Sequence, residues 1–294
     1  MNILVAGGTG FIGQSLCDAL HEAGHDVTAL ARSPGGEVPE GVDTAVGDVT
    51  AYDSIEGAFE GRDAVYNLVA LSPLFEPSGG NEMHDRVHRR GTKHCVDAAE
   101  KHGVSRFVQL SALGADPDGS THYLRAKGRA EEIVRESSLD WTIFRPSVVF
   151  GDGSEFLSFT RKLTPPGIAP LPGGGETRFQ PIYVEDFVGM LVEALEPEHV
   201  GETYEIGGPE TLTLAEVAKL ARRAQGQSVR VVPVPMAIAG VGLKLGGLVP
   251  GFPMGGDQYR SLQLDNTTPD NDIDAFGLEA AELTRLATYL GVES

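Results

Sequence analysis

Hydrophobic residues in the first half of the chain form short continuous runs that alternate with longer stretches, where apolar residues recur every three or four positions. Short apolar runs are typical of buried strands, and the longer spacing is typical of amphipathic helices. The predicted strands are Asn2–Ala6, Asp26–Ala31, Val42–Val46, Ala64–Val69, Arg106–Leu110 and Trp141–Phe144. The predicted helices are Phe11–Ala23, Asp53–Phe59, Glu82–His102 and Tyr123–Ser137. Strands that alternate with helices predict an α/β fold with a doubly wound parallel sheet.

The pattern changes after Pro146, because residues 151–180 are rich in Gly and Pro and predict an excursion away from the sheet. The elements predicted beyond it are the helices Val184–Glu196 and Thr213–Gln225 and the strand Thr203–Ile206. Thr211 or Thr213 is a candidate N-cap for the second of these helices. The expected division is a core at residues 1–150, to which 178–207 return, and a smaller lobe at 151–177 and 208–294.

A glycine-rich loop, Gly7-Gly8-Thr9-Gly10-Phe11-Ile12-Gly13, lies directly between the first predicted strand and the first predicted helix. Glycine permits a tight turn and lets the backbone approach a pyrophosphate, and the helix N-terminus attracts negative charge. A turn that serves packing alone is the alternative, but the strand–glycine–helix context favours a dinucleotide site. The candidate cofactor-binding residues of this loop are Gly7, Thr9, Gly10, Phe11, Ile12 and Gly13.

The second predicted strand ends in Leu30-Ala31-Arg32-Ser33, without an acidic residue. A carboxylate at this point would accept a hydrogen bond from the ribose 2′-hydroxyl of NAD, whereas an arginine can pair with the 2′-phosphate of NADP. The sequence therefore favours NADP over NAD, with a solvated surface charge as the other interpretation of Arg32. Asp48, followed by Val49, is a candidate acceptor for the adenine amino group or a simple turn residue. We expect Leu68, Val69 and Ala70 to lie beside the cofactor.

Ser111, Tyr123 and Lys127 form the candidate catalytic set. Tyr123 and Lys127 lie four residues apart at the start of a predicted helix, so they share one helix face. A free tyrosine has a pKa of about 10 and is a poor acid or base at neutral pH. The ammonium of Lys127 and an oxidised nicotinamide would lower that pKa, Ser111 would hold the substrate oxygen, and Lys127 could hold the nicotinamide ribose. Such a pair also arises by chance, but its place after the glycine loop favours catalysis.

These residues resemble the extended and atypical members of the short-chain dehydrogenase/reductase superfamily, which are NAD-dependent epimerase/dehydratase-like proteins. The segments Arg106–Ala115, Trp141–Gly151 and Phe179–Asp186 resemble the group related to the nucleotide-binding accessory subunit of respiratory complex I. The resemblance covers nearly all of residues 1–290 and implies a Rossmann core with a smaller C-terminal substrate lobe. The roles it implies are pyrophosphate contacts for Gly7, Gly10 and Gly13, a proton relay of Ser111, Tyr123 and Lys127, and positions near the nicotinamide for Pro146 and Val149.

Several residues stand outside this scheme. His88 occupies a position where extended members carry an Asn that supports the proton relay through water. His88 either supplies hydrogen bonds in its place, leaves the relay weaker, or is an ordinary surface histidine. We expect Arg145 to fix its loop by backbone contacts, and Arg178 to anchor an anionic substrate or to pair with Glu185 or Asp186. His84, His94 and His102 show no metal-ligand spacing, so we expect no metal.

The 294-residue chain carries 42 acidic and 23 basic residues, a net charge of −19, which excludes a generic nucleic-acid binder. Only six of the basic residues are Lys, and this composition is typical of a halophilic cytoplasmic protein, with an ordinary acidic protein as the alternative. Cys17 and Cys95 are expected to be buried. No apolar run is long enough to predict a transmembrane segment, and the N-terminus has no signal-peptide pattern. The apolar stretch 236–249 is expected to cover the substrate cleft or to contact a partner or a membrane surface, which would make the protein peripherally membrane-associated.

The sequence thus predicts an NAD(P)-dependent oxidoreductase or epimerase-like enzyme that moves a hydride between nicotinamide and a carbonyl or alcohol of a small-molecule substrate. The alternative is a non-catalytic NADP(H)-binding accessory or assembly subunit of a respiratory NADH dehydrogenase-type complex. A third interpretation is a redox sensor that responds to NADP or NADPH occupancy. The presence of Tyr123 together with Lys127 favours the enzyme.

Overall fold

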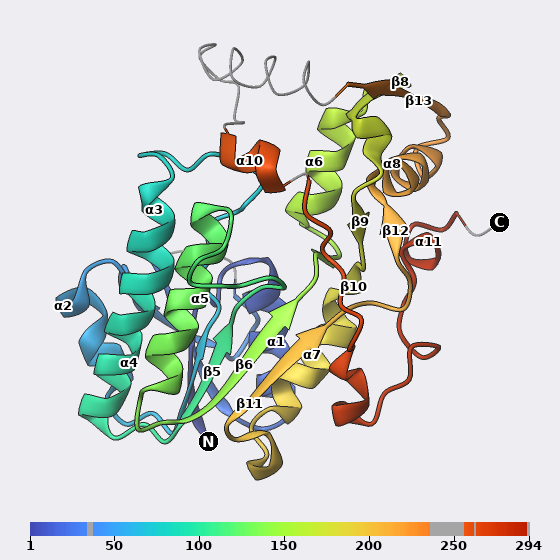
Figure 1. The fold of residues 1–294 in the computed structure, drawn as a ribbon. Helices are drawn as coiled ribbons and strands as arrows, with labels where there is room; N and C mark the ends of the chain where they lie inside the picture. Colours follow the sequence, from blue (N-terminus) through green and yellow to red (C-terminus); the bar gives the residue numbers. More distant parts are fainter. Residues whose placement is uncertain (34–37, 236–255, 262, 293–294) are drawn as a thin grey trace. The chain divides into compact units, whose positions relative to one another are not determined.

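The computed structural model describes residues 1–33, 38–235, 256–261 and 263–292 (Figure 1). The apolar stretch 236–249, for which the sequence predicts a covering or docking role, lies outside the described residues. The chain divides into two compact units. The first unit comprises Met1–Leu71, Asn81–Pro146 and Val184–Tyr204, and the second comprises Ser72–Gly80, Ser147–Tyr183 and Glu205–Ser294.

A seven-stranded sheet with the order β11-β6-β5-β4-β1-β2-β3 forms the centre of the first unit. Its neighbouring strands from β6 to β3 pair in parallel. The strands are β1 (Asn2–Ala6), β2 (Asp26–Ala31), β3 (Asp43–Val46), β4 (Ala64–Asn67), β5 (Arg106–Leu110), β6 (Asp140–Pro146) and β11 (Glu202–Ile206). The order reverses between β1 and β4, the point at which open α/β sheets bind ligands outside the carboxyl ends of the strands. This arrangement confirms the predicted fold, a doubly wound Rossmann-type sheet.

Helices cover both faces of this sheet (Figure 1). The helices α4 (Gly91–His102) and α5 (His122–Arg135) pack against each other on one face, and α1 (Phe11–Glu22) and α7 (Val184–Glu193) pack together on the other. Successive side chains of β4 point to opposite faces. The side chain of Val65 joins the core beneath α4, whereas the Tyr66 hydroxyl donates to the Leu191 carbonyl of α7 at 2.8 Å.

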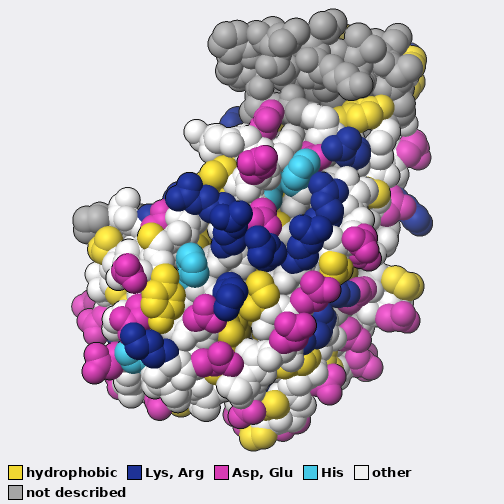
Figure 2. All heavy atoms as spheres, turned by 60° about the vertical axis from the view of Figure 1, so that its left-hand side comes forward, with side chains coloured by type: hydrophobic (Ala, Val, Ile, Leu, Met, Phe, Trp, Pro, Cys, Tyr) yellow, Lys and Arg dark blue, Asp and Glu magenta, His cyan; other side chains and the backbone are white. Residues whose placement is uncertain are grey.

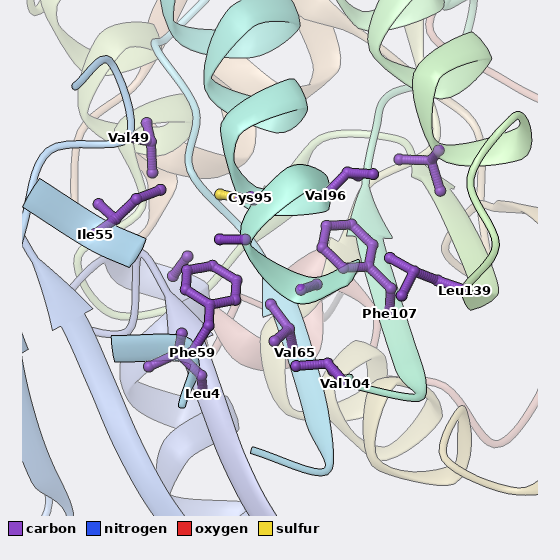
Figure 3. Packing of buried hydrophobic residues seen from close by; sticks show 14 of the residues in the cluster. Leu4, Val49, Ile55, Phe59, Val65, Cys95, Val96, Val104, Phe107 and Leu139 are labelled. Atoms are coloured by element: carbon purple, nitrogen blue, oxygen red, sulfur yellow. The ribbon is translucent and has the colours of Figure 1, made fainter. Parts of the chain in front are cut away.

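The core beneath α4 is built from strand residues and from one helix face that interlock (Figure 3). Phe59 belongs to the 3₁₀ turn η1 (Glu56–Phe59), which follows α2 (Tyr52–Ile55), so the predicted helix Asp53–Phe59 divides into two short helical pieces. Cys95 is fully buried here, and burial raises the pKa of its thiol to about 12. Burial, together with the charge of Asp18, likewise raises the pKa of the Cys17 thiol to about 12, so both cysteines are the inert apolar residues that were predicted.

The long helix predicted at Glu82–His102 contains a widened turn. A short helix α3 (Glu82–His84) leads into a π-helical turn, η2 (Asp85–Arg90), before α4 begins at Gly91. In this turn the backbone N–H of Gly91 donates to the carbonyl of Arg86, five residues earlier. Hydrophobic periodicity does not distinguish a π turn from an α-helical turn, and π turns occur frequently at functional sites.

The second unit combines short strand pairs with helices. Its elements are β7 (Val149–Phe150), α6 (Glu155–Leu163), β8 (Gly167–Pro172), the 3₁₀ turn η3 (Gly173–Gly175), β9 (Arg178–Phe179), β10 (Ile182–Tyr183), β12 (Leu212–Thr213), α8 (Leu214–Arg223), β13 (Val229–Val234), α10 (Gly256–Ser261), the 3₁₀ turn η5 (Asp272–Phe276) and α11 (Leu286–Tyr289). A core of aromatic and aliphatic residues that includes Phe150, Phe156 and Phe159 joins α6 to α8. Thr213, rather than Thr211, caps α8, in a capping box with Glu216. Among the described residues, no helix has both the length and the hydrophobicity needed to cross a membrane.

The substitution Phe107→Ala should lower the free energy of unfolding by about 3–5 kcal/mol, because it leaves a cavity in the close-packed core beneath α4. Phe107 is fully buried on β5, whereas Val46 on β3 is 54% exposed. Val46→Ala is therefore the matched control, with a change below about 1 kcal/mol. Urea unfolding at constant salt measures both variants, and equal losses for the two would contradict this description of the core.

Candidate functional site

The glycine loop folds so tightly onto itself that side chains are excluded at particular positions. Gly7 has a φ of +87°, a backbone conformation that L side chains rarely adopt. A Cβ on Gly13 would lie 2.2 Å from the Gly7 carbonyl oxygen and 2.8 Å from the Gly8 Cα. A Cβ on Gly8 would lie 2.6 Å from the Cβ of Ala29 on β2. The glycines thus hold the first turn of α1 directly against the ends of β1 and β2.

The N-terminus of α1 is suited to an anion. Gly10 is its N-cap residue, with no side-chain cap and no acidic residue in the first turn. The N-cap residue therefore offers no side-chain acceptor to the first-turn N–H groups of Phe11, Ile12 and Gly13. These N–H groups carry the partial positive charge of the helix dipole. A Cβ added to Gly10 would have one neighbour within 4 Å among the described residues, the Gly7 carbonyl oxygen at 3.2 Å. The outer side of the turn is therefore accessible to a ligand. This cradle fits the pyrophosphate of a dinucleotide, with Thr9 on the same turn.

Three strand ends converge at this loop. Gly7 N–H donates to the Leu30 carbonyl of β2 at 2.9 Å. A Cβ on Gly7 would lie 3.2 Å from the backbone of Leu68 and Val69, so the loops after β1 and β4 run side by side. Leu68 and Val69 are thus next to the glycine loop, and the place of Leu68, Val69 and Ala70 beside a cofactor stays a prediction.

The end of β2 also meets the loop that follows β3. Gly47 N–H donates to the Ala31 carbonyl at 2.9 Å, which brings Asp48 near Arg32. The Asp48 carboxylate accepts from Thr50 N–H at 2.8 Å, the geometry of a turn residue. Partial burial raises the pKa of Asp48, but the bond from Thr50 and the charges of Arg32 and Arg86 outweigh it and lower the pKa below its usual value. Asp48 is therefore a carboxylate, with one oxygen used in the turn.

Lys127 is held inside the first unit by α5, which Thr121 caps through its hydroxyl. Its side chain is 1% exposed, and its Nζ donates to the Leu110 carbonyl at the end of β5, at 2.8 Å. Its Nζ also lies 6.0 Å from the centroid of the Tyr123 ring. Burial lowers the pKa of Lys127 to about 8, although the Glu131 carboxylate opposes the shift. The predicted shared helix face of Tyr123 and Lys127 is thus present.

The predicted lowering of the Tyr123 pKa by Lys127 is not seen. Burial raises the pKa of Tyr123 above its ordinary value, and no charge offsets that shift. The ammonium of Lys127 is bound to the Leu110 carbonyl and lies over the tyrosine ring. The positive charge needed to favour a phenolate must therefore come from elsewhere.

Ser111 is part of a buried charge network that the sequence analysis missed. Its hydroxyl donates to the carboxylate of Glu131, which is 0% exposed, at 2.5 Å. Arg145 binds the same carboxylate through two nitrogens, at 2.9 and 2.7 Å, and Arg135 adds a third contact at 2.8 Å. Arg145 therefore binds a buried carboxylate, a partner that the sequence analysis did not predict. Glu131 follows Lys127 by four residues, a spacing visible in the sequence.

His88 is not the surface histidine that one interpretation proposed, because it is 2% exposed. Its Nε2 accepts from Leu71 N–H at 2.8 Å, so in the neutral ring the proton lies on Nδ1. That Nδ1 has no hydrogen-bond partner among the described residues. Burial, with the charges of Lys127 and His84, lowers the pKa of His88 well below its usual value, so the ring is neutral. The His88 ring thus accepts one hydrogen bond through Nε2 and lies beside Tyr123, with the two ring centroids 5.3 Å apart.

The other histidines and Arg178 have structural partners. His94 Nδ1 binds the Val49 carbonyl at 2.7 Å, His102 binds Glu56, and His84 stacks edge-on against Tyr123. The described residues contain no group of three or more His, Cys, Asp or Glu side chains that could hold a metal ion. Arg178 pairs with Asp265 at 2.7 Å, not with Glu185 or Asp186 as one interpretation predicted.

The predicted cofactor residues fall in both units. Pro146 ends β6 in the first unit, where its carbonyl accepts from Leu113 N–H at 3.2 Å. Val149 begins β7 in the second unit. The structure brings together the glycine loop, the Leu68–Ala70 segment and the Arg32–Asp48 pair, and it places Ser111 and Lys127 around the end of β5.

These features define a dinucleotide-binding α/β protein in which a tyrosine lies beside a buried lysine. The chain belongs to the NAD(P)H-binding family, whose model matches residues 7–165, and this family is of the extended short-chain dehydrogenase/reductase type. A relative from Xenophilus azovorans, an NAD(P)H azoreductase, is 30% identical over 82% of this chain and 82% of its own length. NADH dehydrogenase (ubiquinone) 1 alpha subcomplex subunit 9 from Arabidopsis thaliana is 33% identical over 80% of this chain, which spans 60% of that subunit. UDP-glucose 4-epimerase from Thermotoga maritima shares the fold, with a TM-score of 0.74, 20% identity, and coverage of 99% of this chain and 97% of that one.

The substitution Gly13→Ala should weaken binding of NADPH at least about tenfold, because its Cβ cannot fit against the Gly7 carbonyl and the loop must open. The matched control is Gly189→Ala in α7, where an added Cβ meets nothing within 4 Å. Nicotinamide fluorescence titration measures both variants. Unchanged affinity in Gly13→Ala would mean that the dinucleotide does not use this loop.

The substitution Lys127→Met should stabilise the protein by about 1–3 kcal/mol near pH 7, because it removes a buried ammonium. Burial lowers the pKa of Lys127 from its ordinary value of 10.5 to about 8 in the folded chain, so the unfolded chain binds more protons between these values. Wild-type stability therefore rises with pH across this window, and the variant should lose that rise. The Leu110 carbonyl keeps its bond from Gln109, at 2.9 Å.

Urea unfolding at about pH 7 and about pH 9.5 tests the effect of Lys127→Met on stability. A variant that is less stable than wild type at the lower pH would show that Lys127 has a structural role instead.

Proposed function

We propose that the protein is an NADP(H)-dependent oxidoreductase that moves a hydride between nicotinamide and a carbonyl or alcohol carbon of a small molecule. The observation that carries the proposal is the contact of Tyr123 with the buried Lys127, in the same unit as the uncapped glycine loop. Keeping a lysine 1% exposed is unfavourable for stability, and such a residue is typical of a functional site.

In this mechanism Tyr123 carries the proton. A bound nicotinamide would supply or accept the hydride, and its oxidised form is positively charged. The Tyr123 hydroxyl donates its proton to the substrate oxygen during reduction and takes it back during oxidation. Burial keeps this phenol protonated but makes it a weak acid, so the positive charge of the oxidised nicotinamide would be needed to lower the raised pKa of Tyr123. Lys127, with a pKa of about 8, exchanges protons near neutral pH and can restore the one that Tyr123 gives up.

Ser111 has a narrower role in this proposal than the sequence predicts. Its single hydroxyl proton is donated to Glu131, whose carboxylate is also bound by Arg145. Ser111 can therefore offer only lone pairs to a substrate, unless that bond breaks. The Nδ1–H of His88 is a buried donor beside Tyr123 that has no partner among the described residues, and it suits a water molecule or a substrate oxygen. We therefore assign Ser111 and His88 as positioning residues.

The preference for NADP is supported by charge at the end of β2. Arg32 is exposed, and β2 ends without the acidic residue that would bind the ribose of NAD. In a chain of net charge −19, a positive group at this position favours a ligand that brings a phosphate.

A second candidate function is that of an accessory subunit of a respiratory complex. Its support is the similarity to the Arabidopsis subunit described above, together with the Ser111 hydroxyl already bound to Glu131. A nucleotide would then stabilise the fold and would not turn over. Affinity purification from the native membrane fraction would recover a multisubunit dehydrogenase if this function is correct, and the protein alone if it is not.

The substitution Tyr123→Phe should abolish NADPH oxidation with ketones, aldehydes and quinones while NADPH binds with an affinity within about twofold of wild type. It removes the hydroxyl and retains the ring that packs against His88. Tyr289→Phe, in the second unit, is the matched control and should keep its activity. Equal activity in wild type and Tyr123→Phe would exclude this tyrosine as the proton carrier and favour the accessory function.

A further inference from the structure

Basic side chains gather on the face of the molecule drawn in Figure 2, despite the strong net negative charge. Ten of the 23 Lys and Arg residues lie between Asp85 and Arg135. Several of these form ion pairs: Arg89 and Arg90 bind the Asp85 carboxylate at 2.5 and 3.1 Å, and Lys93 binds Asp97 at 2.8 Å. Arg86 differs from its neighbours, because it is exposed and has no hydrogen-bond or salt-bridge partner among the described residues.

The loop after β3 rests on the start of α4, directly after the π turn that carries Arg86. The Val49 carbonyl binds His94 Nδ1 on α4 at 2.7 Å. A Cβ on Gly91 would lie 2.9 Å from the Val49 side chain, so the two backbones approach closely. Gly91 is joined to Arg86 across the π turn by a backbone hydrogen bond. Asp48 directly precedes Val49, so it lies close to the point where this loop meets α4.

The other side of the same loop meets the end of β2. Gly47 N–H donates to the Ala31 carbonyl at 2.9 Å, and Arg32 follows directly. Both Arg32 and Arg86 act on the Asp48 carboxylate and lower its pKa. Two guanidinium groups from different elements thus act on one carboxylate, and the three charges sum to one positive charge.

We propose that Arg86 is a second residue, with Arg32, that selects NADP(H) by binding its 2′-phosphate. This inference rests on the proposed function, since it assumes a dinucleotide on the glycine loop with its adenosine over β2 and β3. A phosphate in this place would neutralise the excess positive charge and accept forked hydrogen bonds from a guanidinium. The ribose 2′-hydroxyl of NAD(H) brings no such charge. Arg86 should therefore raise the affinity for NADP(H) and leave the affinity for NAD(H) unchanged.

The test compares NADPH and NADH binding to the full chain in wild type, Arg86→Ala, Arg86→Lys and Arg90→Ala, at one KCl concentration. Nicotinamide fluorescence titration gives each affinity. Arg86→Ala should weaken NADPH about 10- to 100-fold, the usual effect of losing a charged hydrogen bond to phosphate, and change NADH less than about twofold. Arg86→Lys should retain part of the NADPH affinity. Arg90→Ala is the matched control for the general positive field, and it should change neither ligand because Asp85 already binds Arg90.

Two results would overturn the assignment of Arg86. An equal loss of NADPH and NADH affinity in Arg86→Ala would mean that Arg86 contacts a part of the dinucleotide common to both, such as the adenine ring. No loss of either would mean that it contacts neither. Competition experiments with 2′,5′-ADP, which carries the 2′-phosphate, and with 5′-AMP, which lacks it, test the same distinction on the adenosine part of the cofactor. Arg86→Ala should weaken the binding of 2′,5′-ADP and leave that of 5′-AMP unchanged. Failure of the proposed function has a different signature: wild type would then bind NADPH without oxidising it in the presence of ketones, aldehydes or quinones, and Arg86→Ala would still separate NADPH from NADH.

Discussion

The rest of the first unit depends on one steric constraint, the contact of the first turn of α1 with the end of β1. A Cβ on Gly13 would lie 2.2 Å from the Gly7 carbonyl oxygen, and a Cβ on Gly8 would lie 2.6 Å from the Cβ of Ala29. Neither position has room for a side chain. This contact sets where α1 begins and leaves its N-terminal N–H groups without a side-chain cap. It also brings the ends of β1, β2 and β4 to one place, so the helix dipole and the strand ends act on the same ligand.

A second constraint is the burial of charge along one face of α5. Tyr123, Lys127 and Glu131 follow one another at intervals of four residues, and the last two are almost completely buried. Burial shifts the pKa of Lys127 down toward the range where it exchanges protons, and Arg145 and Arg135 keep the Glu131 carboxylate compensated. Removing one partner from such a network leaves an uncompensated buried charge. Ser111 is therefore bound to a carboxylate, that of Glu131, which the network holds in place. The buried ammonium of Lys127 thus lowers the stability of the fold while it places a proton-exchanging group beside Tyr123.

The sequence was sufficient for features that depend on neighbouring residues. The strand–glycine–helix pattern predicted the loop at Gly7–Gly13, and a spacing of four predicted the shared face of Tyr123 and Lys127. Features that depend on distant residues were missed or misassigned. Arg178 pairs with Asp265, 87 positions away, and the effect of Arg86 on Asp48 depends on the contact of the β3 loop with the start of α4. The spacing of four residues between Lys127 and Glu131 is visible in the sequence and indicates that both lie on one helix face. Only the structure shows that Glu131 points inward and accepts a hydrogen bond from Ser111.

Release of a bound reduced cofactor from the wild-type protein tests the central claim most directly. NADPH and NADH would each be bound at high salt and then displaced, with nicotinamide fluorescence as the readout. An oxidoreductase that exchanges its cofactor at each turnover predicts release within seconds and tighter binding of NADPH than of NADH. Release over hours would contradict exchange at each turnover and favour a structural nucleotide. Binding of neither cofactor would contradict the dinucleotide site itself.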